Sequence, residues 1–261
     1  MLLMLPLSRL KEAASYSKQL AVNSRQWVVD SERFGIGLTG GQLAQFERYQ
    51  ALLLEWNERV NLTAITDPAV IPIRHFLDSL SCTVVTGDLT GQSLVDVGTG
   101  AGFPGLPLKI LYPGMALTLV ESVGKKAEFL GVVAAELALE NVTLVTERAE
   151  TVGQDAAYRE RFDWVAARAV AGMAVLVEYL LPLCKVGGRM LAQKGESAPE
   201  ETEQAAEAIE LLGGGEAALT EVELPGVENR HYLVVVEKVR PTPEKYPRRV
   251  GVPGKRPIGG G

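Results

Sequence analysis

The sequence has 261 residues, of which 47% are hydrophobic, and a net charge of −6 at pH 7, so it can bury a large core and suggests one or two domains. Its first apolar run, residues 1–7, is interrupted by Pro6 and is far shorter than the roughly 20 residues that span a bilayer. It also lacks the ordered regions of a secretory signal, and we expect no membrane partner and a cytoplasmic location.

The chain has only two cysteines, Cys82 and Cys184, and two histidines, without a CxxC pair. This composition indicates neither a disulfide framework nor a zinc site, and we expect no metal. Both thiols are predicted to be buried core groups, with a catalytic cysteine as the alternative.

The N-terminal part is predicted to hold an extension and then helices. Residues 1–38 show no sustained periodicity and are predicted to be disordered or poorly ordered. From Gly41 apolar residues recur every three or four positions, which predicts a helix of about five turns. A second helical segment, starting at Asp67 and kinked near Pro72, completes a helical region over 39–90 that packs on the sheet. This segment carries three polar residues that could orient or cap it against the sheet: Arg74, His75 and Asp78.

Residues 91–240 alternate short β-rich runs with helical stretches, which is typical of parallel βαβ units. Five such runs are expected at 94–97, 116–120, 142–146, 162–166 and 189–192. Two further runs, 217–224 and 232–236, are separated by a short turn and predict an antiparallel hairpin. The fold class is therefore predicted to be α/β, with a doubly wound, mostly parallel, seven-stranded sheet.

Basic residues gather at the C-terminal end. Residues 238–261 contain seven Lys and Arg and one acid, a net charge of +6, which leaves −12 for the rest of a chain whose total is −6. A basic, Pro- and Gly-rich tail over 241–261 on an acidic body predicts an electrostatic contact for a polyanion. A solvated, disordered tail is the alternative.

The run DVGTGAGFPG follows the first predicted strand and opens a helix. Glycines at Gly98, Gly100 and Gly102 let the backbone turn sharply and approach a ligand. A dinucleotide fingerprint needs its third glycine where this chain has Phe103, so the spacing favours a nucleoside without a pyrophosphate. Asp96 could receive the ammonium of a methionine moiety, directly or through water. A strand-to-helix corner without a ligand is the alternative.

Acidic residues follow the next two predicted strands. Glu121 could accept hydrogen bonds from both ribose hydroxyls, and we include the adjacent Ser122 in the same site. Ala149 and Glu150 could meet the adenine edge. A solvent-facing acid and a helix N-terminal acid are the alternatives. Because ligands of open α/β sheets bind beyond the carboxyl ends of the strands, the order of these residues predicts a cofactor site.

Several runs then carry a resemblance to a known family: Trp56-Asn57, Asn61-Leu62-Thr63-Ala64, His75 with Asp78-Ser79-Leu80, DVGTGAGFPGLPL, Arg148-Ala149-Glu150, Ala167-Arg168-Ala169-Val170-Ala171, Lys194-Gly195 and Tyr246-Pro247-Arg248-Arg249. From about residue 41 to 257 the chain resembles the bacterial ribosomal RNA small-subunit methyltransferase G family, also called glucose-inhibited division protein B. Residues 1–38 fall outside the resemblance.

This resemblance implies a Rossmann-like class I methyltransferase that uses S-adenosyl-L-methionine. It implies methylation of N7 of one guanine of 16S ribosomal RNA near the decoding centre, guanine 527 in the usual numbering, with the RNA or the small subunit as partner and no obligate protein partner. It also places the cofactor on six positions of this chain: Gly98, Phe103, Glu121, Ala149, Glu150 and Arg168.

The chemistry of N7 requires positioning rather than a general base, because N7 already carries an in-plane lone pair. The chain accordingly lacks the Asn/Asp-Pro-Pro-aromatic loop of exocyclic-amine methyltransferases. Candidate guanine-side groups are Arg168, Lys194 and Asn61. An ion pair at a helix start, a surface cation and a cap are their respective structural alternatives. His231 is expected to be structural.

Three other functions remain open from the residues alone. A small-molecule methyltransferase would share the cofactor site, and a nicotinamide oxidoreductase is disfavoured by Phe103. An RNA-binding protein without activity is the third, since a basic tail gives affinity without chemistry.

Overall fold

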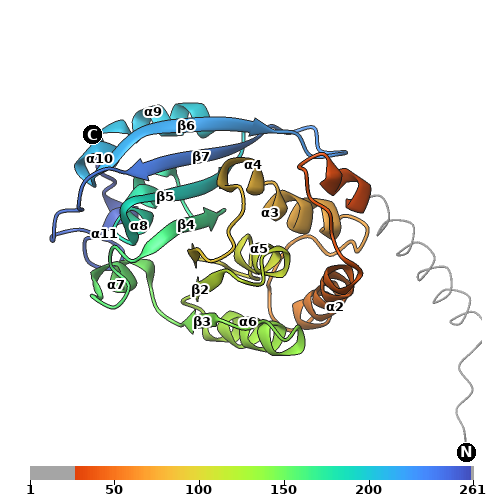
Figure 1. The fold of residues 1–261 in the computed structure, drawn as a ribbon. Helices are drawn as coiled ribbons and strands as arrows, with labels where there is room; N and C mark the ends of the chain where they lie inside the picture. Colours follow the sequence, from red (N-terminus) through yellow and green to blue (C-terminus); the bar gives the residue numbers. More distant parts are fainter. Residues whose placement is uncertain (1–26, 260–261) are drawn as a thin grey trace, which may run out of the picture.

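A seven-stranded sheet runs through the centre of the protein (Figure 1), in the order β3-β2-β1-β4-β5-β7-β6. The structure is a computed structural model and describes residues 27–259. The strands are β1 (Ser93–Val97), β2 (Ala116–Val120), β3 (Val142–Val145), β4 (Phe162–Arg168), β5 (Cys184–Lys194), β6 (Gly214–Val222) and β7 (His231–Lys238). β1 to β5 pair in parallel, whereas β7 lies antiparallel between β5 and β6. The predicted sheet and its final hairpin are confirmed.

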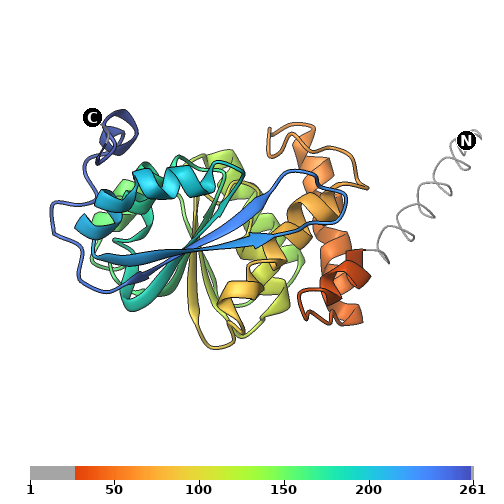
Figure 2. The ribbon, with the colours of Figure 1, turned by 90° about the horizontal axis from the view of Figure 1, so that it is seen from above.

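Helices cover both faces of this sheet, as Figure 2 shows from above. They are α2 (Gly40–Asn57), η1 (Pro72–Leu77), α3 (Asp78–Leu80), α4 (Thr83–Thr86), α5 (Gly105–Leu111), α6 (Gly124–Glu136), α7 (Ala149–Gln154), α8 (Met173–Leu180), α9 (Ala198–Gln204), α10 (Ala206–Leu211) and α11 (Val252–Lys255). Alternation along the strands divides the core: Leu94 packs with α2, α5 and α6, whereas Val95 packs with α7, α8 and α10. None of the helices in the described part of the chain has the length and hydropathy to cross a membrane.

The strand order reverses direction between β1 and β4, because the chain adds β2 and β3 on one side of β1 and then β4 and β5 on the other. In open α/β sheets this switch point, at the carboxyl ends of the strands, is where ligands bind. The residues that follow β1, β2 and β4 are therefore the candidates for a ligand-binding site.

The helical segment before the sheet is confirmed, with one difference. Thr39 and Gln42 form a capping box at the start of α2, and Asp67 accepts a hydrogen bond from the Ala69 N–H at the start of the next segment. At Pro72 the chain enters the π-helix η1 instead of a kinked α-helix.

The prediction that residues 1–38 form a poorly ordered extension is wrong for its second part. Residues 27–32 are helical, and Trp27 is 4% exposed. Its ring contacts those of Phe46, at 5.2 Å between centroids, and Phe76, at 6.2 Å. Aromatic packing thus holds this segment, whose helical part, residues 27–32, is too short to show a sustained periodic pattern. Residues 1–26 lie outside the described residues.

The C-terminal segment is packed, so the alternative of a solvated tail is wrong for the described residues up to 259. Tyr246 and Ile258, each 8% exposed, belong to the core on the α8 face. Arg248 pairs with the fully buried Glu178 of α8, with 2.5 Å between Nη2 and Oε2. The two cysteines are buried as predicted, and burial raises the pKa of Cys184 to about 12.

Candidate active site

The glycine-rich turn follows β1 and is hydrogen-bonded to β2 by the N–H groups of Gly98 and Thr99, which donate to the Val120 carbonyl. Gly98, Gly100 and Gly102 have φ angles of +66°, +61° and +100°, a region that favours glycine. A Cβ at Gly98 would lie 2.8 Å from a methyl of Val170, whereas at Gly100 the nearest atom would be 4.0 Å away. Gly98 is therefore required by packing, and Gly100 opens onto free space.

The side chain of Asp96 anchors this turn by hydrogen bonds. It is 0% exposed, and its Oδ2 accepts hydrogen bonds from Thr99 Oγ1 (2.6 Å) and from the Gly105 N–H (2.8 Å). Burial raises the pKa of this carboxyl to about 6. Its Oδ1 is buried and has no hydrogen-bond partner among the described residues. A ligand group or a water molecule that brought an N–H or O–H donor to this position would satisfy that oxygen.

Glu121 follows β2 and faces the same turn. Its Oε2 accepts from the Gly100 N–H (3.0 Å) and its Oε1 from the Val123 N–H (2.8 Å). Each carboxylate oxygen has a second lone pair, so the group can still accept hydrogen bonds from hydroxyls. The adjacent Ser122 is exposed.

Glu150 lies in a different environment from the one expected. It is 2% exposed, and its Oε1 accepts from the Gly251 N–H (2.8 Å) of the C-terminal segment. The carboxylate therefore anchors that segment. A cofactor contact by Ala149 and Glu150 would have to use their main chain.

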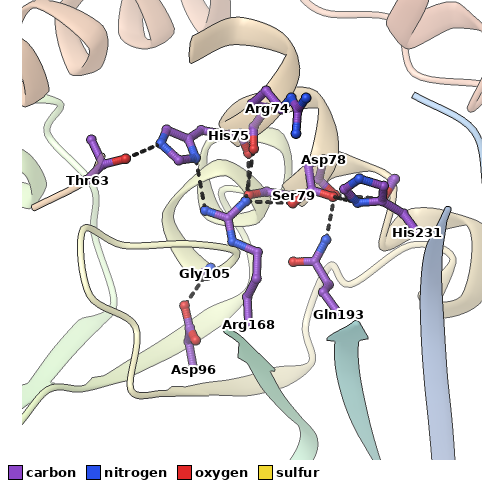
Figure 3. Close-up of polar contacts among 11 residues, drawn as sticks. Thr63, Arg74, His75, Asp78, Ser79, Asp96, Gly105, Arg168, Gln193 and His231 are labelled. Carbon is purple, nitrogen blue, oxygen red and sulfur yellow. Dashed lines mark hydrogen bonds and ion pairs between the residues drawn. The ribbon is translucent and has the colours of Figure 1, made fainter. Parts of the chain in front are cut away.

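Arg168 ends β4 and joins a cluster at the top of the sheet (Figure 3). Its Nη1 donates to Asp78 Oδ2 at 2.6 Å, and its Nη2 lies 3.2 Å from His75 Nδ1. The guanidinium carbon stands 4.7 Å from the centroid of the Phe103 ring. The rings of His75 and Phe103 stack at 4.5 Å, and Tyr49 stacks on Phe103 at 5.5 Å. The Phe103 side chain is thus a support for Arg168 and His75.

The two titratable partners of Arg168 are held in fixed protonation states. Burial first, and then the charge of Arg168, lower the pKa of His75 to about 4. Since arginine only donates, Nδ1 of the neutral ring accepts, and Nε2–H donates to Thr63 Oγ1 at 2.8 Å. Burial opposes ionisation of Asp78, but the hydrogen bond from His231 and the charge of Arg168 hold its pKa below the usual value. Neither group is a free general base.

Lys194 and Asn61, the other two residues predicted to contact the guanine, are not among the partners of Arg168. Lys194 Nζ pairs with Glu201 Oε2 (2.6 Å) and donates to the Ala171 carbonyl (3.0 Å). Asn61 is exposed, and it is Asn57 whose Oδ1 caps the loop.

Residues not predicted from the sequence complete the site. His231, expected to be structural, places Nδ1 3.4 Å from Asp78 Oδ1. Gln193 Nε2 donates to the Asp78 carbonyl at 2.7 Å. The only sequence signal for Gln193 is that a polar residue directly follows a short apolar run, residues 190–192, near the end of β5. Among residues 27–259 no group of His, Cys, Asp and Glu side chains is arranged to hold a metal ion.

Comparison with known proteins places this geometry in a family. The model of the family described as rRNA small subunit methyltransferase G matches residues 42–232. The chain is 57% identical over 225 residues to a ribosomal RNA small subunit methyltransferase G of Roseiflexus castenholzii, covering 86% of this chain and 95% of the relative. It is 47% identical to the protein of that name from Alkaliphilus metalliredigens, covering 87% and 95%. The solved structure of a mutant of MtNAS superposes with a TM-score of 0.50 at 17% identity, over 76% of this chain and 75% of that one, and supports the fold alone.

Proposed function

The chain belongs to the rRNA small subunit methyltransferase G family, and from that premise we propose that it transfers a methyl group from S-adenosyl-L-methionine to N7 of a guanine in 16S ribosomal RNA. The position we propose is guanine 527 in the usual numbering, near the decoding centre. The observation that carries the proposal is that the open glycine turn, Glu121 and Arg168 meet at the switch point of a class I methyltransferase sheet.

The residues around the turn fit this cofactor. Free space at Gly100 admits a ligand against the main chain, and the second lone pairs of Glu121 suit two ribose hydroxyls. The unpartnered Asp96 Oδ1 suits the amino group of a methionine moiety through water. The remaining contacts that we propose are with Gly98, Gly102, Phe103, Ser122, Ala149, Glu150 and Arg168. When bound, the cofactor supplies an electrophilic methyl group on a sulfonium.

The charged groups near Arg168 are arranged for positioning rather than for proton transfer. His75 is neutral, and both His75 and Asp78 are hydrogen-bonded to Arg168. A guanine N7 needs no deprotonation before it attacks a methyl group, so a site without a free base suits it. Holding the base in line in a site shielded from water accelerates such a reaction by proximity. In our proposal Arg168 positions the base, and Lys194 and Asn61 contact the substrate at the periphery of the site.

The proposed partner is 16S rRNA or the small ribosomal subunit, in the cytoplasm. Exposed cations available to phosphates are Lys125, Lys245, Arg249, Lys255 and Arg256. Phosphate contacts of this kind supply affinity without sequence information.

The test uses small subunits isolated from cells that lack the modification, and labelled S-adenosyl-L-methionine. We expect label on one guanine of 16S rRNA, and chain cleavage there after borohydride and aniline treatment, which is diagnostic of 7-methylguanosine. Free 16S rRNA is the parallel substrate and distinguishes naked RNA from the assembled particle. Label on another base, or on a small molecule only, would contradict the proposal.

A further inference from the structure

A cavity of about 240 Å³ lies at the carboxyl ends of β4 and β5, beneath the start of β7. Its volume is below the roughly 300–1,000 Å³ of sites for drug-sized ligands, a size suited to one flat ring system. Six lining side chains carry a charged, amide, imidazole or phenol group, and they come from α3, β4, β5 and β7: Asp78, Arg168, Gln193, Lys194, His231 and Tyr232.

Arg168 contacts both this cavity and the residue that follows the glycine turn. It lines the cavity and also packs over Phe103, which directly follows Gly102. Because β4 is the neighbour of β1 in the sheet, a ring in the cavity would lie next to the cofactor side, beside Arg168.

Gln193 presents an unused acceptor. The residue is 7% exposed, and its Oε1 has no hydrogen-bond partner among the described residues. The amide orientation is fixed, because a flip would turn Oε1 toward the Asp78 carbonyl that Nε2 now bonds at 2.7 Å. A buried acceptor without a partner is unfavourable, and a ligand that brings an N–H donor would satisfy it.

Asp78 supplies a second acceptor beside Gln193. Its Oδ2 is bound to Arg168, whereas its Oδ1 has only the 3.4 Å contact with His231 Nδ1. Two of the residues that line the cavity thus carry an acceptor with room for a further hydrogen bond, one of them negatively charged, and they are joined by the hydrogen bond between Gln193 and the Asp78 main chain.

We propose that this cavity holds the target guanine, with its N1–H on the Asp78 carboxylate and its N2 amino group on Gln193 Oε1. The inference rests on the proposed function and adds how the base is recognised. Guanine alone among the RNA bases places two donors side by side on its Watson–Crick edge, and enzymes read a flipped-out base on that edge. Adenine would set its N1 acceptor against the Asp78 carboxylate.

The same placement of the guanine also explains why N7 is the atom that is methylated. N7 lies on the five-membered ring, at the opposite end of the base from N2. With N2 at Gln193 on β5, N7 is directed toward β4 and the glycine turn. Lys194 remains on the cavity wall as a donor for O6.

The experiment is a double-mutant cycle between the enzyme and the base. Gln193→Met removes the acceptor at nearly constant volume, and reconstituted small subunits that carry inosine at the target position remove only the N2 amino group. Gln50→Met is the matched control, since Gln50 is 8% exposed and its amide also donates to a main-chain carbonyl, that of Pro68 (3.0 Å), outside the cavity lining.

For wild-type enzyme, kcat/KM with inosine should fall at least about tenfold below that with guanine, the cost of leaving one buried group unpaired. Gln193→Met should lose a similar factor with guanine and little more with inosine, because both changes remove one contact. Calorimetry should show unchanged cofactor affinity, and Gln50→Met should keep the wild-type ratio between the bases.

Two outcomes overturn the inference. Equal losses of Gln193→Met on both bases would mean that the amide is only structural, and a wild-type enzyme indifferent to inosine would mean that N2 is not read. Either result leaves the proposed function intact as long as wild-type enzyme produces 7-methylguanosine. Failure of that product, by contrast, would refute the proposed function itself.

Discussion

Gly100 is the position at which the cofactor site can be tested with least disturbance of the fold. Its φ is +61°, and a Cβ there would come no closer than 4.0 Å to another group, the Gly98 carbonyl oxygen. Alanine would therefore cost about 1–2 kcal/mol for the left-handed backbone and nothing for collision. At roughly 2–4 °C per kcal/mol for a chain of this size, the unfolding midpoint should fall by about 2–8 °C.

A matched control exists at the amino end of β1, opposite the candidate site. Gly91, in the turn before β1, has φ +76° and nothing within 4 Å of an added Cβ, so Gly91→Ala carries the same backbone strain away from the site. Gly98→Ala is less informative, because its Cβ would collide with Val170 at 2.8 Å.

The assay is calorimetry of S-adenosyl-L-methionine binding to both variants at a temperature where both are folded. If the cofactor lies against Gly100, the added methyl group should cost about 1–3 kcal/mol, as overpacking does, which is about 5- to 150-fold in Kd. Gly91→Ala should bind like the wild type. Wild-type affinity in a folded Gly100→Ala protein would refute the assignment of this turn to the cofactor.

Four further predictions use other contacts. Arg248→Ala should destabilise the protein by about 3–5 kcal/mol in denaturant unfolding, because it leaves the carboxylate of Glu178, which is 0% exposed, unpaired; an unchanged midpoint would show that the pair is not formed. Arg249→Ala, at an exposed position, should leave stability unchanged and lower the salt dependence of RNA binding by about one phosphate contact. Because burial depresses the pKa of His75 from 6.5 to about 4, its contribution to stability is fully present above pH 6.5 and is lost as the pH falls to 4, by about 3 kcal/mol; His75→Gln should show a flatter unfolding profile over that window. Glu121→Gln should weaken cofactor binding by about 1–3 kcal/mol, and neither form should bind NAD; tight NAD binding would favour an oxidoreductase.

Most of the sheet could be predicted from the sequence, because its strands are short apolar runs separated by helical spacing. β5 shows where the pattern fails: it was expected over 189–192 and extends over Cys184–Lys194. Gly187 and Gly188 are typical of a turn, yet a Cβ at Gly188 would lie 2.7 Å from the Phe162 carbonyl oxygen. This glycine permits close approach of β4, a requirement that no local pattern reveals.

The candidate site could be predicted as a set of positions but not as a set of contacts. Asp96 and Gly100 lie at the end of β1 and Glu121 follows β2, and parallel topology brings the ends of these neighbouring strands together. The partners of Arg168 could not be found in this way, since Asp78 and His75 precede it by 90 and 93 residues. Packing between the helices and the sheet determines which hydrogen-bond acceptors are already bound to protein groups. It therefore also determines which acceptors remain available to a ligand.

The charge distribution along the sequence predicted a basic tail that contacts RNA independently of the cofactor domain. The structure argues against this independence. Lys238 is 0% exposed and donates to the Leu181 carbonyl at 2.6 Å, and Arg248 neutralises a buried carboxylate, so neither positive charge is free for RNA. The same segment is anchored by the Gly251 N–H on Glu150, a position proposed to face the cofactor. Replacing Arg248 together with Arg249 would therefore disturb folding, RNA affinity and the cofactor side at once. Of these two arginines, Arg249, whose side chain is exposed, is the one whose replacement isolates an electrostatic contribution of this segment to RNA binding.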